Sequence, residues 1–231
     1  MTTSLVLSAG GMWAAWEVGA WRVLRDHLRP DLIVGASAGA WNGWAIAGGA
    51  TPDELACEWM NPLTAEVMRS RPHALHLKAQ ELFTRFQPRS PYLLTLVEVP
   101  NLRPCAISGS DVTWQHLAAS GSIPCVFPPV KIDGRYYVDG GFRGALPLWA
   151  AEEAGATRAI ALNVLNTPLF RTAHRFLGWK KASPALEVIR IEPSEPLGSL
   201  YDAVVWNATN IERWIDLGER DALRAMSSVR M

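Results

Sequence analysis

The chain has 231 residues, of which 49% are hydrophobic and 19% charged, so it can bury a substantial core and is not a low-complexity disordered chain. Its 22 basic and 22 acidic side chains give a formal net charge of zero, which argues against nucleic acid as the main partner and leaves apolar or neutral substrates open. Three widely spaced cysteines match no metal-ligand pattern, so we expect free thiols in a reducing compartment and neither a metal nor a cofactor; they are Cys57, Cys105 and Cys125.

Two strand–helix pairs are predicted at the start of the chain. Residues 4–11 are an apolar run ending in small residues, which indicates a buried strand and a tight loop, and residues 12–28 have helical spacing. Residues 31–37 and 38–49 repeat the strand and the helix. The uncharged stretch after Asp31 is long enough to raise a membrane span, but its five glycines favour strand, turn and helix instead. This alternation predicts a mostly parallel sheet covered by helices.

The rest of the chain alternates between helical and strand signals. Residues 52–100 indicate helices interrupted by prolines and then a strand, and the pattern leaves their arrangement open. A strand, a helix, a hairpin, a helix, two strands and an amphipathic helix are then predicted over residues 103–111, 112–122, 130–141, 146–155, 156–165, 185–194 and 200–226. Without repeats or an obvious linker, we predict a single domain over residues 1–231, of the α/β class, with three layers (α/β/α) around a central mostly parallel sheet.

A serine stands among small residues where the second predicted strand meets the second predicted helix. Gly35 and Gly39 flank Ser37 in a G-x-S-x-G pattern, and the small neighbours let a sharp turn close without Cβ clashes. The hydroxyl would then stand at a helix N-terminus, where backbone amides and the helix dipole favour negative charge. The pattern predicts a nucleophilic serine; a Gly-rich turn without a catalytic function is the alternative.

A second Gly-rich loop, Ser8-Ala9-Gly10-Gly11-Met12, follows the first predicted strand. If the first two strands are neighbours, both loops meet at the carboxyl edge of the sheet, where ligands bind in such folds. We expect the backbone amides of Gly10 and Gly11, with Met12 beside them, to form an oxyanion hole. The alternative is that these glycines only allow close packing of strand and helix.

Asp139 is the candidate base for Ser37. It ends an apolar strand and precedes Gly140 and Gly141, a position where α/β enzymes keep catalytic groups, although an Asp-Gly turn is the simpler interpretation. The order Ser37, Asp139, His174 formally fits an α/β-hydrolase triad. That fold places its nucleophile after several strands, whereas here one strand precedes the strand that carries the serine. We therefore interpret the five histidines as structural.

Three stretches together resemble the patatin-like phospholipase family, including its cytosolic phospholipase relatives: "LSAGGMWA", "GASAG" and "ASGSIPCVFPPVKIDGRYYVDGG". The resemblance runs from about residue 4 to residue 165. It implies a patatin-like (lysophospholipase-like) fold and a serine acyl hydrolase that cleaves lipid esters with a Ser–Asp dyad and no histidine. Carried over, Ser37 is the nucleophile, Asp139 is the base, and Gly10 and Gly11 supply the oxyanion amides.

The first loop departs from the family pattern Gly-Gly-Gly-x-Arg-Gly/Ala. Trp13 stands where the family has an arginine that can help to hold a phosphate, and an indole offers one donor and no charge. The missing arginine concerns whether the substrate carries a phosphate group. It does not affect the prediction of ester cleavage. After Asp-Gly-Gly the family often has asparagines before a proline, whereas this chain has Gly144 and Ala145 before Pro147.

Eleven tryptophans is a high count, and four of them flank the two loops: Trp13, Trp16, Trp41 and Trp44. Aromatic residues at helical spacing most often pack in a core. The alternatives are an acyl pocket, lined by Trp13 and Trp41, and insertion into a lipid interface.

The sequence therefore predicts a carboxylic ester hydrolase acting on lipids: a lipase or esterase, with phospholipase A and lysophospholipase activity left open. We expect a cytoplasmic location, a lipid or acyl-ester substrate as partner, and no nucleic acid; peripheral contact with a membrane is left open.

The alternatives to a hydrolase are a transacylase of the malonyl-transferase type, whose motif usually has a histidine where Ala36 and Ala38 stand, and a catalytically inactive lipid-binding protein. A Rossmann dinucleotide site fits less well because the glycine spacing differs. Substrate headgroup, chain length and oligomeric state are not predicted.

Overall fold

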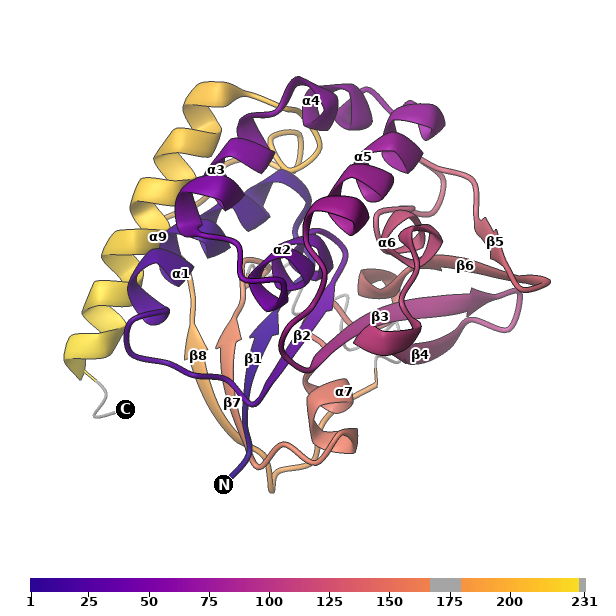
Figure 1. Ribbon diagram of the computed structural model, residues 1–231. Helices are drawn as coiled ribbons and strands as arrows, with labels where there is room; N and C mark the ends of the chain where they lie inside the picture. Colours follow the sequence, from indigo (N-terminus) through magenta and orange to yellow (C-terminus); the bar gives the residue numbers. More distant parts are fainter. Residues whose placement is uncertain (167–179, 229–231) are drawn as a thin grey trace.

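An eight-stranded sheet forms the centre of the computed structural model, which describes residues 1–166 and 180–228 (Figure 1). The strands are β1 (Thr3–Leu7), β2 (Leu32–Ala36), β3 (Tyr92–Val99), β4 (Arg103–Ser108), β5 (Val130–Ile132), β6 (Arg135–Asp139), β7 (Arg158–Leu162) and β8 (Glu187–Ile191). Their order is β5-β6-β3-β2-β1-β7-β8, with β4 paired to β3. The pairings among β1, β2, β3, β7 and β8 are parallel and those of β4, β5 and β6 are antiparallel, so the predicted mostly parallel sheet is confirmed.

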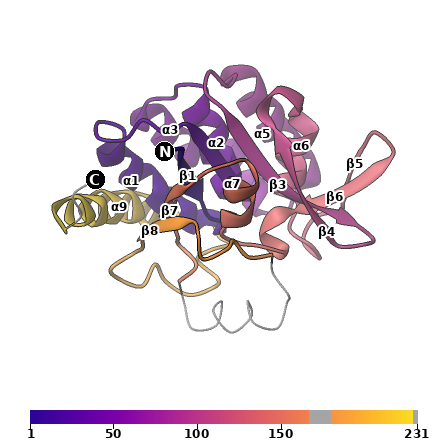
Figure 2. The same cartoon turned by 90° about the horizontal axis from the view of Figure 1, so that it is seen from below.

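Helices lie on both faces of the sheet, which gives the three predicted layers. They are α1 (Ala15–Leu24), α2 (Ala38–Ala47), α3 (Pro52–Met60), α4 (Pro62–Met68), α5 (Pro72–Arg85), α6 (Trp114–Ser120), α7 (Leu148–Glu153) and α9 (Ala208–Ser228). Because side chains alternate along a strand, Leu5 and Leu7 join the larger core under α1, α2 and α9, whereas Val6 packs in a smaller core with Trp149 of α7. Figure 2 shows α1 and α9 side by side at one end of the molecule and the β5–β6 hairpin at the other.

Three consecutive helices occupy the region whose arrangement the sequence left open. Each of α3, α4 and α5 begins with a proline, at the position where a missing N–H and a fixed φ are tolerated best. Thr51 completes the start of α3 with a capping box: its hydroxyl accepts the Glu54 N–H at 3.2 Å, and the Glu54 carboxylate accepts the Thr51 N–H at 2.8 Å. Pro62 and Pro72 therefore start new helices, as expected of prolines that interrupt a helical pattern.

Two predicted helices have different boundaries in the structure. The helix predicted over residues 12–28 starts as a 3-10 turn and ends earlier, and the one predicted over residues 200–226 starts only at Ala208. Asn207 sets that start, because its side-chain oxygen accepts the Asn210 N–H at 3.0 Å. The residues before Asn207 form a turn instead, and this turn reaches the site described below.

Two smaller expectations can be compared directly with the structure. The β5–β6 hairpin turns at Asp133 and Gly134, whose φ values of 46° and 82° lie in the left-handed region that a tight hairpin needs. The three cysteines are free thiols, as predicted. Over residues 1–166 and 180–228, no helix combines the length and the apolar character that crossing a membrane requires.

Candidate active site

Ser37 and Asp139 meet because β2 and β6 end at adjacent positions of β3. β2 runs parallel to β3 and ends with Ala36 opposite Thr95, whereas β6 runs antiparallel and ends with Asp139 opposite Leu96. β4 pairs with β3 along both of these stretches, so it occupies one edge of β3 and leaves the other edge to β2 and β6. The carboxyl ends of the two strands therefore approach each other head on, and Ser37, the residue after β2, lies beside Asp139.

The two side chains are joined by a short hydrogen bond. Ser37 Oγ donates to Asp139 Oδ2 at 2.6 Å, and Asp139 Oδ1 accepts the Gly141 N–H at 2.7 Å, which holds the plane of the carboxyl group. Both residues are buried, at 4% and 6% exposure. Ser37 has φ 56° and ψ −130°, a strained conformation for a residue with a side chain, and this is the sharp turn that the small neighbours allow.

Burial changes the acidity of the carboxyl group. It raises the pKa of Asp139 from 3.8 to about 6, against the opposing effect of the hydrogen bonds from Ser37 and Gly141. The group is ionised at neutral pH and is a stronger base than an exposed aspartate. A carboxylate in direct contact with a hydroxyl can accept its proton, which is the arrangement that activates a serine.

The first Gly-rich loop packs closely against the turn that carries Ser37 and against the loop that follows Asp139. A Cβ on Gly39 would come within 2.4 Å of the Ser8 carbonyl oxygen, and a Cβ on Gly141 within 2.6 Å of the Ala9 side chain. Larger residues would force the three loops apart. β1 and β2 are parallel neighbours, so the expected meeting of the two Gly-rich loops at one edge of the sheet is confirmed.

Met12 differs from the two glycines that precede it. Its N–H donates to the Ala203 carbonyl at 2.8 Å, so this amide is already engaged, which argues against the predicted contribution of Met12 to an oxyanion hole. Ala203 belongs to the turn before α9. The candidate donors are thus Gly10 and Gly11; Gly11 has φ 55°, in the left-handed region that favours glycine.

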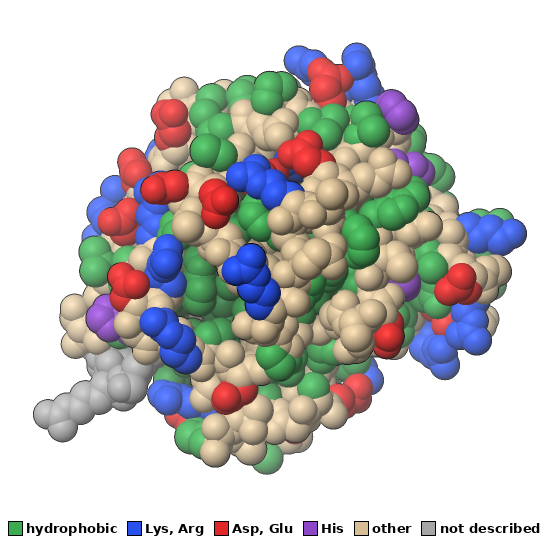
Figure 3. All heavy atoms as spheres, viewed as in Figure 1, with side chains coloured by type: hydrophobic (Ala, Val, Ile, Leu, Met, Phe, Trp, Pro, Cys, Tyr) green, Lys and Arg blue, Asp and Glu red, His purple; other side chains and the backbone are tan. Residues whose placement is uncertain are grey.

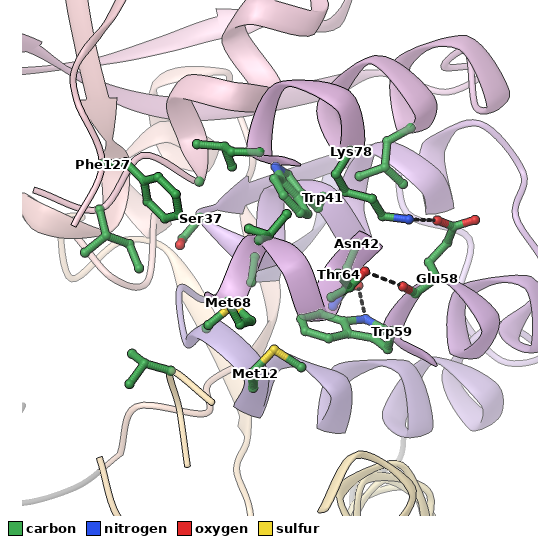
Figure 4. A pocket seen from close by; sticks show the side chains of 18 of the residues that line it. Met12, Ser37, Trp41, Asn42, Glu58, Trp59, Thr64, Met68, Lys78 and Phe127 are labelled. Atoms are coloured by element: carbon green, nitrogen blue, oxygen red, sulfur yellow. Dashed lines mark hydrogen bonds and ion pairs between the residues drawn. The ribbon is translucent and has the colours of Figure 1, made fainter. Parts of the chain in front are cut away.

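An apolar cavity of about 330 Å³ opens beside Ser37 (Figure 4). Its floor is one face of α2, where Ser37, Trp41 and Ala45 follow one another at helical spacing. Its walls are α3, α4, α5 and the loop after α6, and the apolar lining includes Leu55, Trp59, Val67, Leu75, Phe127 and Val204. A cavity of this kind takes the hydrocarbon part of a ligand while a few polar groups fix its orientation.

The tryptophans near the two loops belong mainly to the core. Trp13, Trp16 and Trp44 are at most 2% exposed, so these three cannot insert into lipid without unfolding. Trp41 lines the cavity, and its indole N–H donates to the Leu117 carbonyl at 2.8 Å. Trp13 is buried in the larger core and is not among the residues that line the cavity, which argues against its predicted place in the acyl pocket.

A buried ion pair lines the part of the cavity that lies away from Ser37 (Figure 4). Lys78 of α5 contacts the carboxylate of Glu58 on α3, and the two side chains are 2% and 7% exposed. Sequence reasoning missed this pair. The available signal was the spacing of Leu75, Lys78 and Leu82, which places a lysine in the apolar stripe of a helix.

Removing one partner of this pair should destabilise the protein. Among the described residues, Lys78→Met leaves the buried Glu58 with the half-exposed Arg85 as its one ion-pair partner and also removes the 3.1 Å contact between Lys78 and Glu81, so we expect the free energy of unfolding to fall by about 3 kcal/mol. Urea unfolding at pH 7 measures the loss. The double variant Lys78→Met/Glu58→Leu removes both buried charges and should recover most of it, and an equal loss in the single and double variants would contradict this account.

Ser37 pairs with a carboxylate rather than a histidine in the described part of the chain. His116 helps to cap the start of α6: its Nδ1 lies 2.9 Å from Thr113 Oγ1 in the capping box of that helix. His174, the third member of the alternative triad, lies outside the described residues. Residues 1–166 and 180–228 contain no group of three or more His, Cys, Asp or Glu side chains placed to hold a metal ion.

The cavity reaches the surface of the molecule. Val126 and Val204 both line it, and they are 43% and 45% exposed. On the face drawn in Figure 3, acidic and basic side chains are interspersed and apolar side chains lie between them, in keeping with the balanced composition.

Comparisons with known proteins find a sequence family and solved structures of similar fold. The family model described as Patatin-like phospholipase matches residues 5–100 and 101–152. Among solved structures, VipD from Legionella pneumophila is similar in fold, with a TM-score of 0.56 and 11% identity over 98% of this chain and 67% of that chain. The type III effector protein ExoU gives a TM-score of 0.46 and 10% identity over 98% of this chain and 53% of that chain. No curated protein sequence matches the chain.

Proposed function

Because the chain belongs to the patatin-like phospholipase family, we propose that it is a lipid acyl hydrolase in which Ser37 is the nucleophile and Asp139 the base. The observation that carries this proposal is the 2.6 Å hydrogen bond between the two side chains beside an apolar cavity. A hydroxyl, a carboxylate with a raised pKa and a hydrocarbon-sized space are the parts that ester cleavage of a lipid requires.

The reaction begins when Asp139 accepts the Ser37 proton and Ser37 Oγ attacks the ester carbonyl carbon. The carbonyl oxygen becomes an oxyanion, which the Gly10 and Gly11 amides and the N-terminus of α2 stabilise. Asp139 then gives its proton to the departing alcohol, and the acyl group stays on Ser37 as an ester. Water attacks this ester with Asp139 again as base, which frees the fatty acid and restores the serine.

The cavity suits the acyl chain and leaves the alcohol portion outside. Burying each methylene group contributes roughly 0.8 kcal/mol, so binding energy comes mainly from the hydrocarbon part of the substrate. The buried Trp13 supplies no charge in the place of the family arginine. We therefore propose carboxylic esters of lipids as the substrate class. Binding in this proposal does not require a phosphate group on the substrate.

A substrate panel tests this function. It contains short p-nitrophenyl esters, monoacylglycerol, lysophospholipid and diacyl phospholipid, with Ser37→Ala as the blank. We expect the wild type to release acid or alcohol from at least one ester well above the blank and to be labelled at Ser37 by a fluorophosphonate probe. Equal rates for wild type and blank on every substrate, together with no labelling, would refute a hydrolase.

The same panel separates hydrolysis from acyl transfer. Addition of an alcohol or lysolipid acceptor diverts the acyl group to a new ester if the protein is a transacylase, whereas a hydrolase continues to release free acid. The proposal expects free acid as the main product.

A further inference from the structure

A carboxyl group without a charged partner among the described residues is buried between the two Gly-rich loops. Glu17 of α1 is 0% exposed. Its Oε2 accepts a hydrogen bond from Asn42 Nδ2 at 2.9 Å, and its Oε1 accepts one from Ser8 Oγ at 3.4 Å. Ser8 is the first residue of the loop that contains Gly10 and Gly11, and Asn42 lies on α2 little more than one turn after Ser37. Glu17 thus joins the candidate oxyanion loop to the helix that carries the nucleophile.

The partners of Glu17 are themselves tied to other parts of the site. Ser8 Oγ accepts the Val164 N–H at 3.0 Å, just beyond the end of β7. Asn42 Nδ2 also donates to the Ala14 carbonyl at 2.9 Å, and Asn42 Oδ1 accepts the Trp59 indole N–H at 2.9 Å. Trp59 and Asn42 line the cavity (Figure 4), so one chain of hydrogen bonds connects the first loop, α2 and the cavity wall.

We infer that Glu17 is a positioning residue for the proposed reaction: in its neutral form it holds the Gly10–Gly11 loop against α2 so that the loop amides face the oxyanion. This inference rests on the proposed function. Glu17 touches neither substrate nor Ser37 in this arrangement and acts through Ser8 and Asn42. A displacement of one donor by about 1 Å is enough to weaken an oxyanion hole, because the gain depends on donors fixed in advance.

The surroundings of Glu17 favour its neutral form. Burial raises the pKa of Glu17 from 4.5 to about 8, and the opposing hydrogen bonds come from Asn42 and Ser8. No charged side chain of the described residues contributes to this shift; the groups that hydrogen-bond the carboxyl are Ser8, just after β1, and the side-chain amide of Asn42 on α2. Ionisation would create an unpaired buried charge, which water could reach only if the loop moved away from α2.

The test is the alkaline side of the pH–rate profile in wild type and in Glu17→Gln. Glutamine keeps the size and can hydrogen-bond Ser8 and Asn42 but cannot ionise. We expect wild-type kcat to fall by up to about tenfold per pH unit above pH 8 with KM nearly constant. Glu17→Gln should have kcat within a few-fold of wild type at pH 7 and should keep it to pH 9.5. A flat wild-type profile, or an alkaline decline that persists in Glu17→Gln, would overturn the inference.

Hydrogen exchange of the first loop provides a readout that does not need catalysis. At pH 9.5 the peptide covering residues 8–14 should exchange faster in wild type than in Glu17→Gln, and at pH 6.5 the two should be equal.

Asp221→Asn is the matched control. Like Glu17, Asp221 carries a buried carboxyl group, but it lies on α9 and accepts the Trp16 indole N–H at 2.9 Å. It should leave the alkaline decline of kcat unchanged. Equal exchange of the loop in wild type and Glu17→Gln at pH 9.5 would refute the positioning by Glu17. If wild type instead cleaves no ester at any pH, the proposed function alone is refuted.

Discussion

Replacing Ser37 by alanine is expected to lower kcat/KM for a cleaved ester by on the order of 10⁴- to 10⁶-fold, because the variant lacks the oxygen that forms the acyl-enzyme. The fold should survive, since alanine is smaller than serine and the neighbouring turn already consists of small residues. Steady-state rates with p-nitrophenyl butyrate and the best lipid of the panel measure the effect, with circular dichroism to check the fold. Activity within tenfold of wild type in the folded variant would mean that another group performs the attack.

Ser37→Gly is the matched control for the strained backbone of this turn. Both Ser37→Ala and Ser37→Gly lose the hydroxyl, and they differ by one Cβ: glycine relieves the strained backbone but gives up the packing of that carbon and makes the unfolded chain more flexible. Ser37 has φ 56° and ψ −130°, a region that glycine adopts without the steric cost paid by other residues. We expect Ser37→Gly to be more stable than Ser37→Ala by about 1 kcal/mol and equally inactive. A Ser37→Gly variant that is less stable than Ser37→Ala would contradict strain at this turn.

Asp139→Asn is expected to lower kcat by on the order of 10²- to 10⁴-fold, the usual contribution of a positioned base. An amide keeps the shape of the side chain: its oxygen can still accept the Gly141 N–H and its nitrogen can contact Ser37 Oγ. What it lacks is the ability to take a proton. Loss of activity with an unchanged fold and weaker labelling of Ser37 by the fluorophosphonate probe would support the dyad; nearly full activity would refute Asp139 as the base.

The pH dependence of Asp139 gives the same proposal a second measurement. Only the ionised carboxylate can accept the proton, so wild-type kcat/KM should rise about tenfold per pH unit up to pH 6 and then level off. The effect on stability has the opposite sign. Between pH 3.8 and about 6 the folded protein keeps a proton that the unfolded chain has lost, so this group's contribution to stability decreases as pH rises through that interval. In Asp139→Asn both effects should disappear.

The sequence alone was sufficient for the fold class and for the identity of the candidate catalytic pair. Runs of apolar residues ending in glycine, serine and alanine are local signals, since the strand, the sharp turn and the helix after it involve residues that are close in the chain. The Ser37 turn, the Asp133–Gly134 hairpin and most strands follow from such signals. The family resemblance then joined Ser37 to Asp139 across the chain, which spacing alone could not do.

The middle of the chain shows where local signals end. Prolines correctly marked the interruptions between helices, but nothing local showed that α3, α4 and α5 would together wall a cavity over α2. The ion pair of Lys78 and Glu58 and the burial of Trp13 depend on that packing. Met12 is a similar case: its amide is engaged by Ala203, a residue almost two hundred positions away, whose turn exists because α9 starts at the Asn207 cap.

By itself, then, the sequence determined the order of strands and helices outside residues 52–100, the two Gly-rich turns and the residue types able to perform acyl chemistry, because each depends on neighbours along the chain. Only the tertiary structure decided that β2 and β6 end at Thr95 and Leu96 of the same β3 edge, that Glu17 bridges the two loops, and which amides are left for a ligand. These features are set by strand register and by hydrogen bonds between distant residues. A shift of one residue in that register would turn every side chain to the opposite face and separate the pair.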